Sequence, residues 1–266
     1  MTQTPTPRPL ALVTGASGGI GEEIARELAA RGFDLVLVAR TLSKLESLGE
    51  VLRVQHGVTA HSIALDLSDP AAPAHLEAEV QRRGLVVDVL VNNAGFASYG
   101  EFWQLDLDHE MRMLQVNVTT LVELTRRLLP GMVERGRGRV LNVASTAAFM
   151  PGPLMAVYYA TKAFVLSFSE AIAEELRGTG VTVTTLAPGP TESGFQARAG
   201  MEDSKLVKGR AIMDSATVAR LGVDALLRGQ RVIIPGRANQ LQALSPRFLP
   251  RALVPGIVKS AQAHSH

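Results

Sequence analysis

Short apolar runs alternate along the chain with segments in which apolar residues recur every three or four positions. The apolar runs are typical of buried strands, and the periodic segments are typical of amphipathic helices. Helices are expected at about 20–28, 42–52, 108–129, 157–177 and 216–227, and Asp69-Pro70 marks the start of one more. We predict strands at 10–14, 34–39, 61–65, 88–91, 139–144, 182–187 and 231–234.

Strands that alternate with helices pair in parallel, and the helices then cover both faces of the sheet. The pattern therefore predicts an α/β fold, a doubly wound parallel sheet of about seven strands, in a single domain over 1–266. Residues 1–8 are expected to be a flexible start, and 236–266 form an amphipathic extension. This extension has three possible roles: covering a pocket, packing on a partner subunit, or lying on a membrane surface.

A glycine-rich loop joins the first predicted strand to the first predicted helix, with the sequence Thr14-Gly15-Ala16-Ser17-Gly18-Gly19-Ile20-Gly21. Glycines at such a junction allow a tight turn and bring backbone N–H groups close to a pyrophosphate, which the helix N-terminus also attracts. Because a strand precedes the loop and a helix follows it, the loop is a candidate dinucleotide-binding site.

The same loop also matches Gly-x-Ser-x-Gly, the nucleophile elbow of α/β-hydrolases. That alternative would make Ser17 a nucleophile. It is disfavoured because no strand precedes Leu10 to carry an oxyanion loop. The only late histidines, His264 and His266, lie in the polar end of the chain.

Further polar motifs follow the later strands. Asn92-Asn93-Ala94-Gly95 follows the fourth strand, Ser145 follows the fifth, and Tyr158 and Lys162 stand at Tyr-x-x-x-Lys spacing in the next helix. Residues one helical turn apart share a face, so Lys162 is expected to draw the pKa of the Tyr158 phenol from about 10 toward neutrality. Such a phenol can exchange a proton with a carbonyl oxygen, to which the Ser145 hydroxyl can also donate.

Taken together, these motifs resemble the short-chain dehydrogenase/reductase family in its single-domain form, over about 9–234. The resemblance implies a Rossmann fold and an oxidoreductase that moves a hydride between a nicotinamide and a carbonyl or alcohol substrate. The implied catalytic residues are Asn117, Ser145, Tyr158 and Lys162. Tyr158 would be the general acid or base, Lys162 would also hold the nicotinamide ribose, and Asn117 would hold a water linked to Lys162. A homodimer or homotetramer is expected from the same resemblance.

The resemblance also implies which residues contact the cofactor. Asp66 and Leu67 would meet the adenine, and Thr191 the nicotinamide carboxamide, although Pro190 stands where the family often has valine. The full set of expected cofactor contacts is Gly15, Ser17, Gly18, Gly19, Ile20, Gly21, Arg40, Thr41, Asp66, Leu67, Asn93, Ala94, Gly95, Tyr158, Lys162, Pro188, Gly189 and Thr191.

The end of the second strand indicates which nicotinamide cofactor is used. Dinucleotide-binding proteins that prefer NAD place an acid there for the ribose 2′-hydroxyl, whereas this chain has Arg40 followed by Thr41. Arg40 can meet a 2′-phosphate, and Thr41 and Ser17 can add hydroxyl donors. NADP(H) is therefore expected in preference to NAD(H), which favours reduction as the physiological direction.

The substrate is expected to be an apolar ketone or aldehyde. The segments 96–99 and 149–157 are rich in Phe, Met, Pro and Tyr and would line an apolar pocket, with Tyr159 as a packing or wall residue. The polar segment 192–214 is expected to be a mobile lid. A cofactor-binding sensor without turnover is disfavoured because mere binding does not require Ser145, Tyr158 and Lys162 together.

Composition excludes several other classes. The net charge of +2, from 27 basic and 25 acidic residues, is too small to indicate nucleic-acid binding. The absence of cysteine excludes thiolate metal sites, and the six histidines show no metal-ligand spacing. The longest uncharged stretch, 140–161, contains Pro151-Gly152-Pro153, which argues against a membrane span. Residues 1–9 do not resemble a signal peptide, so a cytoplasmic protein is expected.

Overall fold

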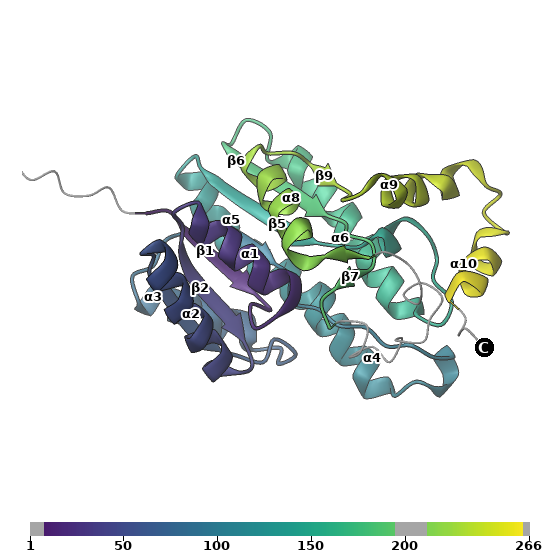
Figure 1. Cartoon of the computed structure of the whole chain (residues 1–266), viewed down its shortest axis with the longest axis horizontal. Coiled ribbons are helices and arrows are strands. Elements are labelled where there is room, and N and C mark those ends of the chain that lie inside the picture. Colours follow the sequence, from purple (N-terminus) through teal and green to yellow (C-terminus); the bar gives the residue numbers. More distant parts are fainter. Residues whose placement is uncertain (1–7, 195–211, 263–266) are drawn as a thin grey trace, which may run out of the picture.

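The computed structural model describes residues 8–194 and 212–262, and its centre is a parallel sheet (Figure 1). Seven strands pair in parallel in the order β3-β2-β1-β4-β5-β6-β9, which confirms the doubly wound α/β fold. The strand order reverses between β1 and β4, where doubly wound sheets form their ligand crevice. The strands are β1 (Leu10–Thr14), β2 (Asp34–Ala39), β3 (Ala60–Ala64), β4 (Val87–Asn92), β5 (Gly138–Val143), β6 (Val181–Leu186) and β9 (Val232–Ile233).

Helices cover both faces of this sheet. One face is covered by α1 (Gly19–Ala30), α2 (Leu42–His56) and α8 (Ser215–Leu227). The other is covered by α3 (Ala72–Arg82), α5 (Leu121–Glu134) and α6 (Ala156–Glu175). Because successive strand residues point to opposite faces, Val13 joins the first core and Leu12 the second.

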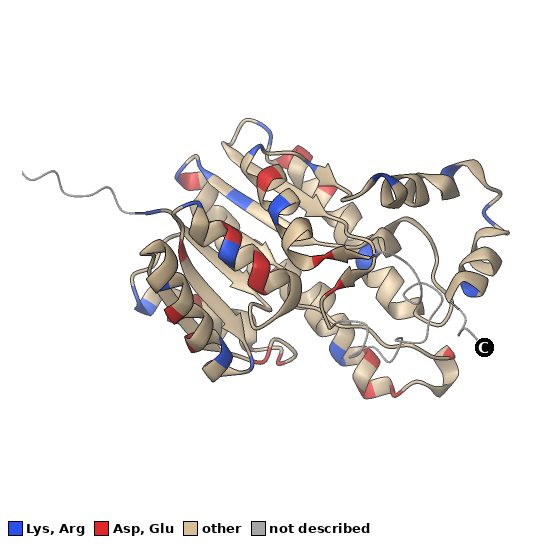
Figure 2. Ribbon diagram, in the orientation of Figure 1, with Lys and Arg blue, Asp and Glu red and all other residues tan. Residues whose placement is uncertain are grey.

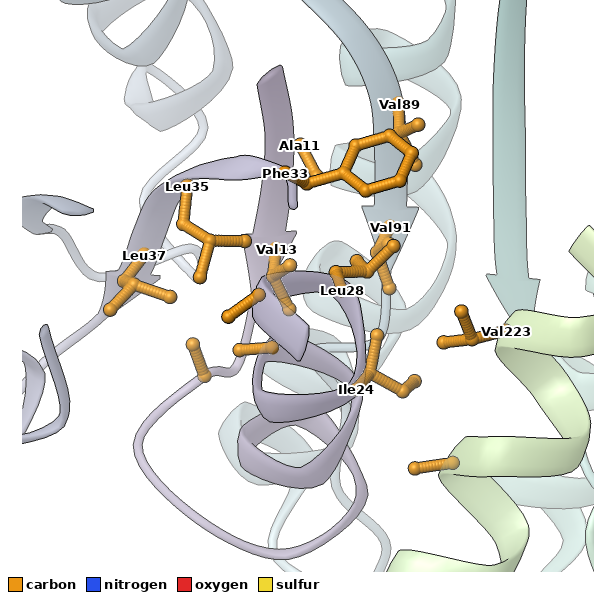
Figure 3. Close-up of a cluster of buried hydrophobic side chains, with 14 of the residues drawn as sticks. Ala11, Val13, Ile24, Leu28, Phe33, Leu35, Leu37, Val89, Val91 and Val223 are labelled. Carbon is orange, nitrogen blue, oxygen red and sulfur yellow. The ribbon is translucent and has the colours of Figure 1, made fainter. Parts of the chain in front are cut away.

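The first of these cores packs α1 and α8 against the strands. Figure 3 shows Ile24 and Leu28 of α1 and Val223 of α8 directed at the sheet residues Val13 and Val91. Each of these side chains is fully buried, and burial of one such side chain contributes roughly 1.5–3 kcal/mol. The apolar periodicity seen in the sequence therefore corresponds to real packing faces, and this core fixes the loop before α1.

The helix expected from Asp69-Pro70 begins later, at Ala72. The Asp69 carboxylate accepts a hydrogen bond from Ala71 N at 2.8 Å, and its carbonyl accepts one from Ala72 N at 3.0 Å. These bonds make a separate turn before the helix. The proline in the first turn of α3 is therefore Pro73 rather than Pro70.

The expected helix over 108–129 is helical throughout but is not a uniform α-helix. It consists of α4 (Leu107–Leu114), the π-helical segment η2 (Gln115–Thr120) and α5, which continues past Pro130. A π-helical segment carries an extra residue in the turn and is frequent at functional sites. Here it carries the predicted site residue Asn117.

The extension after β9 folds into helical segments that pack on one end of the sheet. They are α9 (Arg237–Leu244), η4 (Ser245–Phe248) and α10 (Val254–Gln262). In Figure 1 they lie at the right-hand end, far from β2 and α2. Val254 and Val258 of α10 pack in the same buried cluster as Tyr158 and Tyr159 of α6, so α10 packs against α6, and the covering of a pocket stays a prediction. Packing on a partner subunit and contact with a membrane surface stay predictions.

Several shorter elements complete the described part of the chain. They are the one-turn helices η1 (Phe102–Gln104) and η3 (Thr146–Phe149) and the parallel pair formed by β7 (Thr191–Glu192) and β8 (Met213–Asp214). The expected lid falls largely in 195–211, and the expected flexible start almost wholly in 1–7, both outside the described residues.

In the view of Figure 2, acidic and basic residues are interspersed, and on α1 Arg26 pairs with Glu22 at 2.5 Å. Among the described helices, none has both the length and the apolar character needed to cross a membrane.

Candidate active site

A cavity of about 760 Å³ lies at the carboxyl ends of the strands. Nineteen of the twenty predicted site residues line it, whereas Asn117 does not. The structure thus brings together residues from six separate loops, because parallel strands all end at the same edge of the sheet. The predicted residues in its wall are Gly15, Ser17, Gly18, Gly19, Ile20, Gly21, Arg40, Thr41, Asp66, Leu67, Asn93, Ala94, Gly95, Ser145, Tyr158, Lys162, Pro188, Gly189 and Thr191.

The glycine loop is packed too tightly for side chains at two positions. A Cβ on Gly21 would lie 2.3 Å from Gly15 O, and one on Gly15, whose φ is +67°, would lie 2.7 Å from Asn93 Nδ2. By contrast, no heavy atom lies within 4 Å of the Cβ position of Gly18, which faces open space in the cavity. The loop therefore combines a tight turn with an open approach to the N-terminus of α1, which suits a pyrophosphate.

The Asn92-Asn93-Ala94-Gly95 motif holds the glycine loop in place. The Asn93 amide donates to Thr14 O at 2.9 Å, and the buried Thr14 hydroxyl accepts from the backbone N–H groups of Asn93 and Ala94 at 3.0 and 3.1 Å. Thr14 Oγ1 donates in turn to Val91 O at 3.1 Å. These bonds tie the end of β4 to the end of β1, the point where the strand order reverses.

Ser145, Tyr158 and Lys162 meet at the other side of the cavity. Ser145 precedes η3 and its hydroxyl accepts from Ala147 N at 3.1 Å, while its side chain is also hydrogen-bonded to Tyr158. Lys162 Nζ lies 5.7 Å from the centre of the Tyr158 ring and donates to Val143 O at 2.9 Å. Both Tyr158 and Lys162 are buried. The three side chains therefore surround one small region in which a substrate oxygen could be bound.

The pKa of the Tyr158 phenol differs from the sequence-based expectation. Burial raises this pKa above its ordinary value, and the hydrogen bond with Ser145 opposes the rise only in part. The expectation that Lys162 draws the pKa of Tyr158 toward neutrality is therefore wrong for this structure, because burial penalises the charged phenolate. Tyr158 consequently keeps its proton at neutral pH, the form that a general acid needs.

Burial also lowers the pKa of the Lys162 ammonium to about 8 from 10.5. Between these values the unfolded chain keeps the proton that the folded chain has lost, so the folded state gains stability as pH rises. We expect the unfolding free energy of the protein with Lys162 to rise by about 3 kcal/mol from pH 8 to 10.5 relative to Lys162→Met. Urea unfolding of both proteins at several pH values measures this. Because Tyr158 beside Lys162 can also titrate, both proteins carry Tyr158→Phe in this comparison, and parallel pH profiles would contradict the prediction.

Asn117 is buried beside the cavity rather than in its wall. Its amide Oδ1 accepts from Phe96 N at 3.2 Å, and its Nδ2 donates to Phe96 O at 3.0 Å and to Thr161 Oγ1 at 3.2 Å. A Cβ on Gly95 would lie 3.0 Å from Asn117 Oδ1 and 3.6 Å from Lys162 Nζ. Asn117 thus fixes the loop after β4 against α6, and its role in holding a water stays a prediction.

The far end of the cavity carries positive charge. Arg40 follows β2 and Lys44 lies one helical turn further on, in α2, and both are exposed cavity residues. Asp66 lies nearby, and its Oδ1 accepts from Ser68 N at 3.0 Å and Ser68 Oγ at 2.8 Å. These hydrogen bonds, with smaller help from Arg40, lower the pKa of the Asp66 carboxyl. The positive charges of Arg40 and Lys44 at this end of the cavity are suited to binding a phosphate group.

These features fit a nicotinamide dinucleotide along the cavity. The glycine loop would hold its pyrophosphate, and Arg40, Thr41 and Lys44 would surround the adenine ribose. Lys162 would hold the other ribose. When bound, the nicotinamide supplies a hydride.

The structure also adds cavity residues that the sequence did not indicate. Lys44 could have been found from its spacing of four residues after Arg40, and His109 and Arg112 share one face of α4. Gln242 comes from the C-terminal extension, and no local pattern points to it. In the part of the chain that the structure describes, no group of His, Asp or Glu is arranged to hold a metal ion.

The substrate side of the cavity is largely apolar. Phe96, Met155 and Tyr159 line it, and Tyr159 is the wall residue that the sequence suggested. The Phe96 ring meets the His109 ring edge-on, with centroids 5.0 Å apart. An apolar wall with a few polar groups at one end suits a carbonyl compound with a large apolar part.

Comparison with known proteins agrees with this geometry. The family model for short chain dehydrogenase matches residues 9–203. A solved short-chain dehydrogenase from Sphingobium yanoikuyae, in complex with NADPH, is 33% identical, with a TM-score of 0.81 over 97% of this chain and 99% of that chain. The bulky-bulky ketone specific alcohol dehydrogenase from Comamonas testosteroni is 28% identical, with a TM-score of 0.78 over 98% and 97% of the two chains.

Among curated proteins, the very-long-chain 3-oxoacyl-CoA reductase of Rattus norvegicus is 38% identical over 182 residues. These residues make up 67% of this chain but only 58% of the relative. The chain therefore matches less than two thirds of the length of such relatives. The family match, the sheet order and the residues around the cavity agree, and the chain belongs to the short-chain dehydrogenase family.

Proposed function

We propose that the chain is an NADP(H)-dependent reductase of ketones or aldehydes that carry a large apolar group. The observation that carries this proposal is one continuous cavity with cations at one end and three polar side chains at the other. Arg40 and Lys44 lie at the first end, and Ser145, Tyr158 and Lys162 at the second. Cations on one loop and proton-donating side chains on others, in the wall of the same cavity, suit a cofactor that carries a phosphate apart from its reacting ring.

In the proposed reduction, each polar side chain acts on the carbonyl oxygen or on the proton it receives. The Ser145 hydroxyl donates a hydrogen bond to the oxygen as negative charge develops there. Tyr158, whose phenol is protonated at neutral pH, transfers its phenolic proton to that oxygen. The Lys162 ammonium then stabilises the phenolate that remains, because it lies 5.7 Å from the ring centre. Oxidation of an alcohol uses the same groups in reverse.

The substrate class rests on the apolar wall together with the relatives. One solved relative is named for its specificity for bulky-bulky ketones, and another relative is a very-long-chain 3-oxoacyl-CoA reductase. Both substrate classes contain a carbonyl next to a large substituent. Phe96, Met155 and Tyr159 offer an apolar surface for such a substituent. We therefore favour a ketone with a bulky or long apolar group over a small polar carbonyl compound.

A panel assay tests this proposal. NADPH or NADH oxidation is followed by absorbance with small ketones, bulky aryl ketones, aliphatic aldehydes and a long-chain 3-oxoacyl thioester. We expect the highest kcat/KM for an apolar ketone with NADPH. Binding of NADPH without turnover of any carbonyl would instead favour a cofactor-binding sensor.

The hydrolase alternative is tested separately with a chromogenic ester. β1 is the first strand in the described part of the chain, so no described strand before it carries an oxyanion loop. We expect no esterase activity that depends on Ser17, and loss of such an activity in Ser17→Ala would favour a hydrolase. A cytoplasmic location and assembly into a homodimer or homotetramer stay predictions.

A further inference from the structure

All three tyrosines of the chain lie in or beside the candidate active site. Tyr158 and Tyr159 line the cavity, and Tyr99 packs at the edge of the same apolar cluster. A fourth polar residue, Gln262, joins this group from α10, far away in sequence. Gln262 is completely buried, which is uncommon for glutamine and requires hydrogen-bond partners.

The Tyr159 ring is in contact with other groups on several sides. Gly152 lies against one ring face so closely that a Cβ there would come within 2.2 Å of Tyr159 Cγ. Tyr158 meets the ring edge-on, with centroids 6.1 Å apart and planes at 76°. Gln262 Nε2 donates to the Tyr159 hydroxyl oxygen. The amide of Gln262 thus sets the position of the hydroxyl end of this ring.

The backbone of Gln262 is held by a different contact. Tyr99 Oη donates to the Gln262 carbonyl oxygen at 2.8 Å. One turn earlier in α10, Lys259 Nζ lies 3.2 Å from Glu101 Oε1. Because these contacts secure the helix without the Gln262 side chain, that side chain can be changed while α10 stays in place.

We propose that Gln262 is a positioning residue that fixes Tyr159 as a rigid wall of the substrate side of the cavity. It thereby limits the size of the apolar group that the cavity accepts. Val254 and Val258 of α10 already supply apolar packing in this cluster, so a buried amide is not needed for packing. Its specific effect is on the orientation of the Tyr159 hydroxyl and ring. This inference rests on the proposed function, since it concerns the substrate of that same site.

The kinetic test is Gln262→Met, which keeps the length of the side chain and removes the amide. We expect the ratio of kcat/KM for a bulky ketone to that for a small ketone to rise by about tenfold, mainly through the KM of the bulky ketone. The dissociation constant of NADPH should stay within about twofold, because Gln262 is not among the cavity residues. Gln240→Met, at an exposed position of α9, is the matched control and should leave the ratio unchanged.

A double variant separates action through Tyr159 from a general disturbance. Tyr159→Phe removes the hydroxyl that Gln262 binds, so adding Gln262→Met to it should change the selectivity ratio no further. Equal effects of Gln262→Met with and without the Tyr159 hydroxyl would overturn the proposal. So would an unchanged ratio in the single variant.

A spectroscopic readout decides the point independently of turnover. Labelling with ¹³Cζ-tyrosine gives three resonances, one for each tyrosine, assigned by Tyr→Phe variants. In Gln262→Met we expect the Tyr159 resonance to move and that of Tyr99 to stay, because Tyr99 binds the backbone carbonyl. An unmoved Tyr159 resonance, or movement of both, would overturn the proposal. If the wild-type protein reduced no carbonyl, the proposed function would fail while the Tyr159 resonance still showed whether Gln262 positions this ring.

Discussion

Replacing Tyr158 by Phe is expected to lower kcat for carbonyl reduction by roughly 10²–10⁴-fold, the usual contribution of a general acid. The phenyl ring can keep the packing of the buried tyrosine, but it has no proton to give to the substrate oxygen. NADPH affinity is expected to change little, because the hydroxyl is lost and the ring stays. Steady-state kinetics and a separate fluorescence titration with NADPH distinguish the two effects.

The adjacent residue provides a matched control for this prediction. Tyr159 is also buried and lines the same cavity, but its hydroxyl is bound by Gln262. Tyr159→Phe is therefore expected to cost less than about tenfold in kcat. A loss as large as that of Tyr158→Phe would mean that the wrong tyrosine has been assigned as the acid. Full activity in Tyr158→Phe would contradict the mechanism itself.

Replacing Arg40 by Asp is expected to lower the NADPH:NADH ratio of kcat/KM by about ten- to over a hundredfold, as expected for one charge-assisted phosphate contact. The variant removes a cation beside the expected 2′-phosphate and supplies an acid that can accept from a ribose 2′-hydroxyl. NADPH should therefore bind more weakly, whereas NADH should bind equally or better. Initial rates with both cofactors at one ionic strength measure the ratio.

A general effect of charge must be separated from this specific one. Arg53 is an exposed arginine in α2, paired with Glu50, and it does not line the cavity. Arg53→Asp makes the same change in net charge and should leave the cofactor ratio unaltered. If Arg40→Asp keeps the wild-type ratio, Arg40 does not read the phosphate, and Lys44 becomes the candidate.

The regular part of the fold was predictable from the sequence because strands and helices of a doubly wound sheet are each buried on fixed faces. The runs at 10–14 and 34–39 match β1 and β2 residue for residue. The start of α3 was misjudged because Asp69 hydrogen-bonds a turn rather than a helix. The π-helical segment was not predictable, since one extra residue in a turn leaves the apolar periodicity nearly intact.

Most of the candidate site could also be predicted, because its residues follow strands whose carboxyl ends meet at one sheet edge. The position of Asn117 outside the cavity wall could not, since it depends on how the loop at Phe96 folds back on η2. The direction of the Tyr158 pKa shift depends on burial. The spacing between Tyr158 and Lys162 in the sequence does not reveal how deeply the phenol is buried. Gln262 belongs to no sequence motif, so its contact with Tyr159 required the tertiary structure.

The central place of β1 in the sheet affects how the chain folds. β1 pairs on one edge with β2, the next strand in the chain, but its other edge pairs with β4, beyond β3 and α3 in the chain. Closing so long a loop costs conformational entropy before any contact offsets it, so this pairing is slow. During synthesis the unpaired backbone edge of β1 is exposed until β4 emerges. We therefore expect nascent chains that stop before Val87 to be the species most prone to aggregation and most dependent on chaperones.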